Sequence, residues 1–227
     1  MHTNEKYELL LSAISHEIRN PVTLINSYLQ LISTAHPEVG TYEYWDTVGE
    51  EMQHLKTLLG DLSLFNNSLR IHPITLNMNQ WMHAYGIHGD AFLHSLTVTS
   101  RKEIDFSTLI ANDLPSIHAD PDKLQQVLDN LLRNAFEAIS DSGRISLEVT
   151  AEESVLFLTV SDNGCGITQE QMQQLFEPFV SFKKDGSGLG LAIAQRIIKA
   201  HHGTITVQSE PSSGTRFIIC LPILFEI

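Results

Sequence analysis

The sequence predicts an all-α helical hairpin followed by an α+β sandwich. Two stripes of apolar residues with helical spacing occupy most of the first 62 residues, on either side of a break at 34–41. After a polar stretch that ends at Pro73, short segments rich in β-branched and aromatic residues alternate with helical segments. We therefore expect two domains, at residues 1–70 and 71–227.

Each of the first two helices carries apolar residues at heptad positions. In the first helix these are Leu11, Ile14, Ile18, Ile25 and Ile32, with Val22 and Leu29 widening the stripe. In the second helix they are Trp45, Val48, Met52, Leu55, Leu59 and Leu62. A hairpin of two helices cannot cover both stripes, so we expect a homodimer in which two hairpins form a four-helix bundle.

The remainder of the chain predicts a mostly antiparallel sheet with helices on one face. Helices are expected over residues 120–143, from near Thr168, and over residues 189–203. The first of these has Asp120 as its N-cap and Pro121 as its first helical residue. Five strands are expected at "EIDFSTLI" (103–110), "RISLEVTA" (144–151), "SVLFLTVS" (154–161), "GTITVQS" (203–209) and "GTRFIICLP" (214–222).

The charge of the chain disfavours two classes of partner. Fourteen basic and twenty-seven acidic residues give a net charge of -13, which opposes binding to nucleic acid or to an anionic membrane surface. The N-terminal stretch "MHTNEKYELLLSAIS" has neither the apolar run of a membrane span nor the pattern of a signal peptide. Cys165 and Cys220 match neither a disulfide framework nor a paired metal-ligand spacing, which suits a reducing compartment. We expect a cytoplasmic protein.

The stretch "SAISHEIRNP" contains a candidate nucleophile. With Ile18 and Ile14 on the apolar stripe, His16 falls on the opposite, water-facing side of the helix. An ordinary surface histidine is the alternative, but Pro21 is expected to bend or loosen the helix within one turn of it. Glu17 can approach one imidazole nitrogen and leave the lone pair of the other free to attack an electrophile.

A polar edge runs along the helix predicted from Asp120. Asn130, Asn134 and Glu137 are spaced at i, i+4 and i+7, whereas Asp129 and Arg133 are expected to point to solvent. Capping is the usual role of asparagine in helices, but neither asparagine is near a helix end. We expect these amides to contact a ligand or a hydrated cation, and Mg²⁺ suits an amide oxygen combined with phosphates.

The stretch "SDNGCGI" follows an apolar strand. An Asn-Gly hairpin turn is the simple alternative, but the next segment, "TQEQMQQLF", has helical rather than strand character. Asp162 could accept a hydrogen bond from an exocyclic amine such as that of adenine. Gly164 and Gly166 would allow a ligand to approach the backbone.

Three further glycines precede a predicted helix in "DGSGLGLAIAQ". Gly186, Gly188 and Gly190 free the backbone to curl, and the amides at a helix start attract phosphate oxygens. The segment lacks the lysine spacing of a Walker loop and the strand order of a Rossmann fold. Lys183 or Lys184 supplies a cation for phosphate.

Together these motifs resemble the sensor histidine kinases of two-component signalling along nearly the whole chain. The resemblance rests on "SHEIRNP", "NLLRNAFEAI", "DNGCG", "FEPF" and "GSGLGL", which occur in the order of the family's boxes. It implies that the first domain is the dimerisation and histidine phosphotransfer hairpin. The second domain is then a Bergerat-type ATP-binding domain, as in gyrase, Hsp90 and MutL.

The resemblance also implies roles for individual residues. His16 receives the γ-phosphoryl group of ATP, Glu17 assists as base, Asn134 ligates Mg²⁺ and Asp162 reads adenine. Asn20 matches a position where a polar residue orients water to dephosphorylate a response regulator, and its amide offers both donor and acceptor. The other predicted nucleotide contacts are Asn130, Gly164, Gly166, Lys183, Gly186, Gly188, Leu189 and Gly190.

Two positions bear on the specificity of this resemblance. Hydrolytic relatives have a water-activating glutamate where this chain has Asn130, and an amide cannot act as a general base. The sequence is thus consistent with a site that spares ATP from water. Many family members have lysine or histidine in place of Glu137, and we expect Lys183 to replace that charge.

The function implied is an ATP-dependent protein-histidine autokinase that phosphorylates His16 and passes the phosphoryl group to an aspartate of a response regulator. One alternative is an ATP-independent phosphotransferase, against which Asp162 and the glycine segments argue. Another is a Bergerat-fold ATP-binding regulatory protein in which His16 is idle. Asn130 and the stretch "HEIRNP" argue against that reading.

Overall fold

The structure is a computed structural model that describes residues 2–183 and 186–223. Side chains are described from Glu17 onward, apart from that of Thr99. The side chain of His16 therefore lies outside the described residues, although its backbone is part of the first helix. In the described part of the chain, no helix is long and apolar enough to cross a bilayer.

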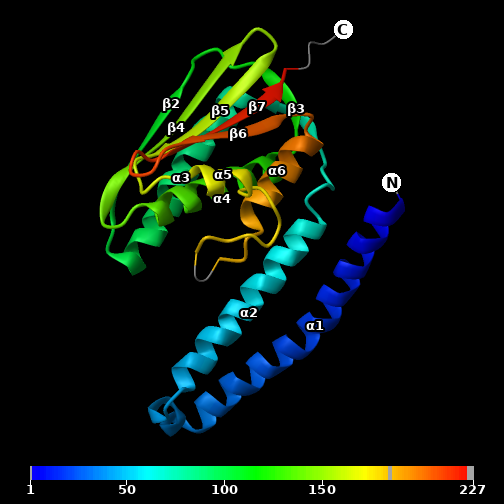
Figure 1. The fold of residues 1–227 in the computed structure, drawn as a ribbon, viewed down its shortest axis with the longest axis vertical. Helices are drawn as coiled ribbons and strands as arrows, with labels where there is room; N and C mark the ends of the chain where they lie inside the picture. The colour runs from blue at the N-terminus through cyan, green and yellow to red at the C-terminus, as the bar shows by residue number, and fades with distance from the viewer. Residues whose placement is uncertain (1, 184–185, 224–227) are drawn as a thin grey trace. The chain divides into compact units, whose positions relative to one another are not determined.

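The chain forms two compact units (Figure 1). The first comprises residues 1–67 together with 181–189, and the second comprises residues 68–180 and 190–227. The first is a helical hairpin and the second contains a β-sheet with helices, which confirms the predicted fold class. The domain boundary expected after residue 70 stays a prediction.

The hairpin consists of two helices joined by a short 3-10 helix. These are α1 (His2–Ala35), η1 (Pro37–Thr41) and α2 (Trp45–Asn66). The proline that opens η1 suits this position because the first residues of a helix need no amide donor. Pro21 lies inside α1, and the helix continues past it to Ala35, so the loosening expected there does not end the helix.

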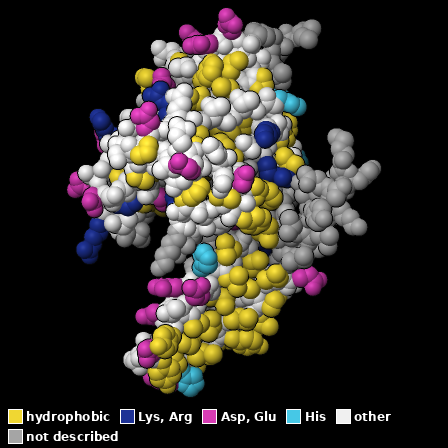
Figure 2. Space-filling view, in the orientation of Figure 1, with side chains coloured by type: hydrophobic (Ala, Val, Ile, Leu, Met, Phe, Trp, Pro, Cys, Tyr) yellow, Lys and Arg dark blue, Asp and Glu magenta, His cyan; other side chains and the backbone are white. Residues whose placement is uncertain are grey.

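Only part of the predicted apolar stripe is covered within the hairpin. Val22 and Leu59 are buried, and Nη2 of Arg19 donates to the carbonyl of Leu59 at 3.1 Å. Figure 2 shows hydrophobic side chains gathered along the hairpin. The large exposed ones are Ile18, Leu24, Ile25, Tyr28, Leu31, Ile32, Tyr42, Tyr44, Val48, Leu55 and Leu64. An apolar face of this size on a helical pair is typical of a protein–protein interface.

A five-stranded sheet with the order β2-β4-β5-β7-β6 forms the second unit's centre. β2 pairs with β4 in parallel, and the other neighbours are antiparallel, as expected. A separate pair, β1 (Ile74–Asn77) and β3 (Ser116–Ala119), was not predicted because each strand has only four residues. The five main strands are β2 (Glu103–Ile110), β4 (Ser142–Glu152), β5 (Val155–Asp162), β6 (Thr204–Ser209) and β7 (Thr215–Pro222).

Helices cover one face of this sheet (Figure 1). They are α3 (Met78–Ser100), α4 (Pro121–Ala138), α5 (Gln169–Gln173) and α6 (Gly190–Ala200). Alternate residues of the strands point at them and form the core, as Ile145, Leu147 and Val149 do in β4. The sequence did not predict α3, whose polar residues and two glycines, Gly86 and Gly89, obscure its apolar period.

Two expected helix ends were wrong. α4 ends at Ala138 instead of Gly143, because Ile139 adopts an extended backbone and buries its side chain. Gly143 instead belongs to β4. α6 ends at Ala200 instead of Gly203.

The N-cap residue Asp120 anchors the start of α4. Asp120 is buried and accepts hydrogen bonds from the backbone amides of His72, Asp122 and Lys123. Burial alone would raise the pKa of Asp120, but these three donors together hold that pKa below its ordinary value.

The solvent-facing orientation expected for Asp129 was wrong. Its Oδ1 accepts hydrogen bonds at 3.0 Å from the Tyr85 hydroxyl and from Nε2 of His88, both on α3. Burial, and then the charge of Asp129, hold the pKa of Tyr85 far above its ordinary value, so this hydroxyl stays a donor. Because α3 was not predicted, no partner for Asp129 was expected.

His201 is buried and links the end of α6 to the start of α4. Its Nε2 accepts a hydrogen bond from the amide of Asp120 at 2.9 Å, and its Nδ1–H donates to the carbonyl of Ile197 at 2.8 Å. The first of these bonds requires a neutral imidazole, because a protonated Nε2 cannot accept a hydrogen bond. Burial holds the pKa of His201 below its ordinary value, although the bond to Ile197 and the nearby Asp120 act in the opposite direction.

We expect the free energy of unfolding to fall as the pH falls through the ordinary histidine pKa of about 6.5, because the unfolded chain then takes up a proton that folded His201 resists. The contribution is present above that pH and is lost below it, by up to about 1.4 kcal/mol per pH unit. Urea unfolding at pH 5.5 to 7.5 measures this slope. His201→Gln should flatten the slope, and the exposed control His83→Gln should not. Equal slopes in wild-type protein and His201→Gln would contradict the assignment.

Candidate functional site

The predicted phosphotransfer residues lie on α1. Glu17 and Asn20 are exposed, one helical turn apart, and a molecule approaching this side of the helix could reach both. The backbone of His16 lies in the same turn, while its side chain is outside the described residues.

A buried amide on α4 lies beside the start of α6. Nδ2 of Asn130 is buried and has no hydrogen-bond partner within the part of the chain that the structure describes. A β-carbon at Gly190 would lie 2.5 Å from Oδ1 of Asn130, so a larger residue there would require the Asn130 side chain to move. The first amides of a helix have no internal acceptor, and here they are next to a buried donor. This arrangement suits a phosphate group.

The amide oxygens of α4 also suit a magnesium ion that is bound through phosphates. Asn134 is half-buried, one turn after Asn130, and Glu137 is exposed. Among the described residues there is no group of three or more histidine, cysteine or acidic side chains that could hold a metal. A site of amide oxygens completed by phosphates and water fits Mg²⁺, which keeps several of its waters.

Asp162 lies at the end of β5, where its carboxylate has a defined orientation. Its Oδ1 accepts a hydrogen bond from the amide of Gly164 at 2.8 Å. The next residue, Asn163, accepts from the amide of Arg144 at 2.7 Å, which holds the loop to β4. The loop is thus ordered by its own contacts before any ligand binds.

Packing within the protein requires glycine in this loop. A β-carbon at Gly164 would lie 2.5 Å from the carbonyl oxygen of Ala138, at the end of α4. Gly166 has a φ of +68°, and a β-carbon there would collide with the carbonyl of Glu210. The sequence suggested that both glycines make room for a ligand. In the structure, the space that a side chain would occupy at either position is already filled by protein backbone.

Sequence reasoning missed a hydroxyl beside Asp162. Thr215 is buried and is the register partner of Asp162 on β7, so the two side chains share one face of the sheet. Its Oγ1 lies 3.0 Å from the Oγ of Ser209. The available signal was a polar residue at an inward position of β7, in alternation with Phe217 and Ile219.

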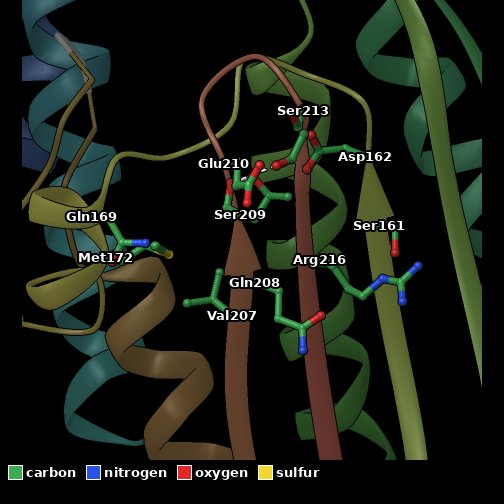
Figure 3. Close-up of a pocket in the computed structure, with 12 residues that line it drawn as sticks. Ser161, Asp162, Gln169, Met172, Val207, Gln208, Ser209, Glu210, Ser213 and Arg216 are labelled. Carbon is green, nitrogen blue, oxygen red and sulfur yellow. Dashed lines mark hydrogen bonds between the residues drawn. The ribbon is translucent and has the colours of Figure 1, made fainter.

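A hollow of about 500 Å³ lies next to this group (Figure 3). Asp162, Ser209, Glu210 and Ser213 lie together at the tips of three neighbouring strands, and Met172 of α5 lies on the other side. Among the predicted nucleotide contacts, only Asp162 lines this hollow. The hollow and the predicted nucleotide site therefore share one carboxylate.

The structure divides the predicted glycine segment between the two units. Residues 181–189 group with the hairpin, whereas Gly190 is the first residue of α6. Ser187 donates a hydrogen bond to Asp61 of α2. Within the segment, Gly188 has a φ of +67°, which favours glycine.

The remaining predicted residues of this segment differ in their environment. Leu189 is 1% exposed, and Lys183 is exposed. A β-carbon at Gly186 would collide with the hydroxyl of Ser181. Asn130, Asn134, Asp162, Gly164, Gly166 and Gly190 belong to the second unit.

Two family models match the chain. Residues 7–68 match the His Kinase A (phospho-acceptor) domain. Residues 119–224 match the Histidine kinase-, DNA gyrase B-, and HSP90-like ATPase. The first match covers the hairpin, and the second covers the helices and strands that carry Asn130 and Asp162.

Solved histidine kinases share the fold. Full-length ShkA in complex with AMPPNP has a TM-score of 0.75 and 24% identity, over 96% of this chain and 46% of that one. The catalytic domain of histidine kinase ThkA has a TM-score of 0.57 and 27% identity, over 67% of this chain and 96% of that one.

Curated relatives match along almost the whole chain. The signal transduction histidine-protein kinase AtoS of Escherichia coli K12 is 33% identical over 94% of this chain and 34% of its own length. Sensor histidine kinase ZraS of Salmonella typhimurium is 34% identical over 95% of this chain and 45% of its own. Sporulation kinase A of Bacillus subtilis is 32% identical over 94% of this chain and 34% of its own length. The chain thus spans between about a third and a half of the length of these relatives.

With both domains matched in order, the chain belongs to the sensor histidine kinases, of which it carries the phosphoacceptor and ATP-binding domains.

Proposed function

We propose that this chain is an ATP-dependent protein-histidine autokinase that phosphorylates His16 and then passes the phosphoryl group to an aspartate of a response regulator. The observation that carries the proposal is the buried Nδ2 of Asn130, which has no hydrogen-bond partner in the described part of the chain and lies beside the start of α6. A buried donor without an acceptor costs about 1–3 kcal/mol. A nucleotide phosphate would remove that cost.

The base is proposed to bind at Asp162. A carboxylate at the end of β5 can accept a hydrogen bond from the exocyclic amine of adenine, and the buried hydroxyl of Thr215 lies on the same face. Gly164 and Gly166 act by letting the loop pack tightly enough to hold this carboxylate. We also propose Lys183, Gly186, Gly188 and Leu189 as nucleotide contacts, on the strength of the family resemblance.

The transfer proposed is a single displacement at phosphorus. One nitrogen of the neutral His16 imidazole forms a bond to the γ-phosphorus, and the bond from phosphorus to the β,γ-bridging oxygen breaks. ADP leaves with that electron pair, and the proton on the other imidazole nitrogen passes to Glu17. An aspartate oxygen of the regulator later attacks the same phosphorus, and the phosphorus–nitrogen bond breaks. Its electron pair stays on the imidazole, which takes the proton back from Glu17 and becomes neutral again.

Mg²⁺ is the proposed metal, held by the amide oxygen of Asn134 together with the nucleotide's phosphates. When bound, such an ion neutralises the charge that develops on the phosphate oxygens. The protein's own part is to orient that amide on α4, whose two ends are secured by other elements.

The exposed apolar side chains of α1 and α2 support a homodimer. We propose that two hairpins pair through the face that contains Ile18, Ile25 and Val48, which would bury this face in a four-helix bundle. We also propose a cytoplasmic location, because the free thiols Cys165 and Cys220 suit a reducing compartment and ATP is supplied there.

Incubation with γ-labelled ATP and Mg²⁺ should label the wild-type protein with an acid-labile, base-stable phosphoryl group. His16→Gln should abolish the label, because glutamine has no imidazole nitrogen to attack phosphorus. His36→Gln, a substitution of an exposed histidine elsewhere in the hairpin, should leave it unchanged. Nucleotide binding without a label on the wild-type protein would favour a regulatory ATP-binding protein. Absence of binding would favour an ATP-independent phosphotransferase.

Asn130→Asp should weaken ATP binding by roughly tenfold to a hundredfold, because the carboxylate loses the buried donor and repels the phosphates. Titration calorimetry at saturating Mg²⁺ measures the dissociation constant. Asn77→Asp is the matched control, since the carboxylate can still cap α3 at this exposed position. Unchanged affinity in folded Asn130→Asp would show that this amide does not contact phosphate.

Asn20 is the basis of a proposed second activity, the dephosphorylation of the response regulator. Asn20→Ala should slow the loss of phosphate from a receiver domain by roughly tenfold or more, because water is no longer oriented. Labelling of His16 should stay normal. The measurement uses a receiver domain that accepts phosphate from this protein, and Gln30→Ala serves as an exposed control on α1. Equal dephosphorylation by Asn20→Ala and wild-type protein would refute the bifunctional proposal.

A further inference from the structure

Lys102, just before β2, reaches the C-terminal end of α4. Its Nζ donates hydrogen bonds to the carbonyl of Phe136 at 3.0 Å and to the carbonyl of Ile139 at 2.5 Å. The same nitrogen lies 4.6 Å from the centre of the Phe136 ring. Lys102 is half-buried, so water screens these contacts less than it would at the surface.

α4 depends on other elements for its C-terminal cap. Its last turn has no basic residue, although the final carbonyls of a helix lack internal donors and form the negative end of its dipole. Lys102 supplies a cation there together with two hydrogen bonds. The carbonyl of Ala138, which lies between these two acceptors, receives the amide of Cys165 at 3.0 Å.

The end of α4 is also the surface against which the Asp162 loop packs. The Cα of Gly164 is so close to Ala138 that a β-carbon would lie 2.5 Å from its carbonyl oxygen. The amide of Gly164 in turn donates to Oδ1 of Asp162 at 2.8 Å. A continuous series of contacts therefore runs from Nζ of Lys102, through the last turn of α4 and the glycine, to the carboxylate.

We propose that Lys102 is a positioning residue for recognition of the nucleotide base. By securing the last turn of α4 it sets the position of Gly164, and so the direction in which Asp162 presents its carboxylate. This inference rests on the proposed role of Asp162 in binding adenine. Lys102 itself touches neither the base nor the phosphates in this scheme, so its effect is on affinity for the base alone.

The test is Lys102→Met in the full chain, with dissociation constants for ATP and ADP measured by calorimetry and KM and kcat measured by autophosphorylation. Methionine retains much of the side-chain length and loses the charge and the donor. We expect both nucleotides to bind more weakly by the same factor, about tenfold, since the loss of two charge-assisted hydrogen bonds would loosen the end of α4 that supports Asp162, and both nucleotides carry the same base. KM for ATP should rise by that factor, and kcat at saturating ATP should stay within about twofold.

Three further variants make the result specific. Lys102→Arg should restore most of the affinity, because guanidinium can donate to both carbonyls. Lys199→Met is the matched control, since it removes an exposed lysine of α6 whose Nζ donates to the side chain of Gln195, and this variant should bind both nucleotides normally. Gly164→Ala should weaken the binding of both nucleotides, because the added methyl group displaces the loop that carries Asp162. If Lys102→Met does not fold, Lys102→Gln replaces it in the same measurements.

The outcomes separate this inference from the proposed function. A folded Lys102→Met that binds ATP and ADP as the wild-type protein does, even with a lower melting temperature, would overturn the positioning role and leave the kinase proposal intact. Weakened ATP binding with unchanged ADP binding would also overturn it. The two nucleotides share the base and differ in the γ-phosphate, so that result would indicate a lost phosphate contact. Wild-type protein that binds neither nucleotide would overturn both.

Discussion

The attachment of α4 at both of its ends is the interaction on which the second unit's candidate site depends. Asp120 caps the start of the helix and accepts an amide from the preceding linker, while Lys102 and Cys165 satisfy carbonyls at its end. Asn130 and Asn134 lie between these two attachments. Their positions are therefore set by the whole unit, which suits their proposed role as amides that contact a charged ligand without reorganising.

Close backbone packing couples this helix to the strand that carries Asp162. Gly164 fits against the carbonyl of Ala138, Gly166 against that of Glu210, and Gly190 against the amide of Asn130. A methyl group at any of these positions would have to displace protein atoms. Glycines that would ordinarily be assigned to ligand approach thus first serve to bring α4, β5 and α6 together, and any binding function depends on that closeness.

The hairpin differs from the second unit in leaving a large apolar face uncovered. Its two helices bury Val22 and Leu59 but expose much of the heptad stripe that the sequence predicts. This difference is consistent with the proposed pairing of two hairpins, which would bury the face in a four-helix bundle. Glu17 and Asn20 are also exposed on α1.

The sequence alone determined the elements whose signals are local: the heptad stripes, the five longer strands, the Asp120 cap and the motifs that identify the family. It did not predict α3, β1 or β3, the end of α4, or the partners of Asp129, and it contained no sign of a role for Lys102. The register of β5 and β7 places Thr215 beside Asp162, across more than fifty residues of chain. These features were decided by tertiary structure, because a hydrogen bond between distant residues, or a space too small for a methyl group, exists only after the elements have packed.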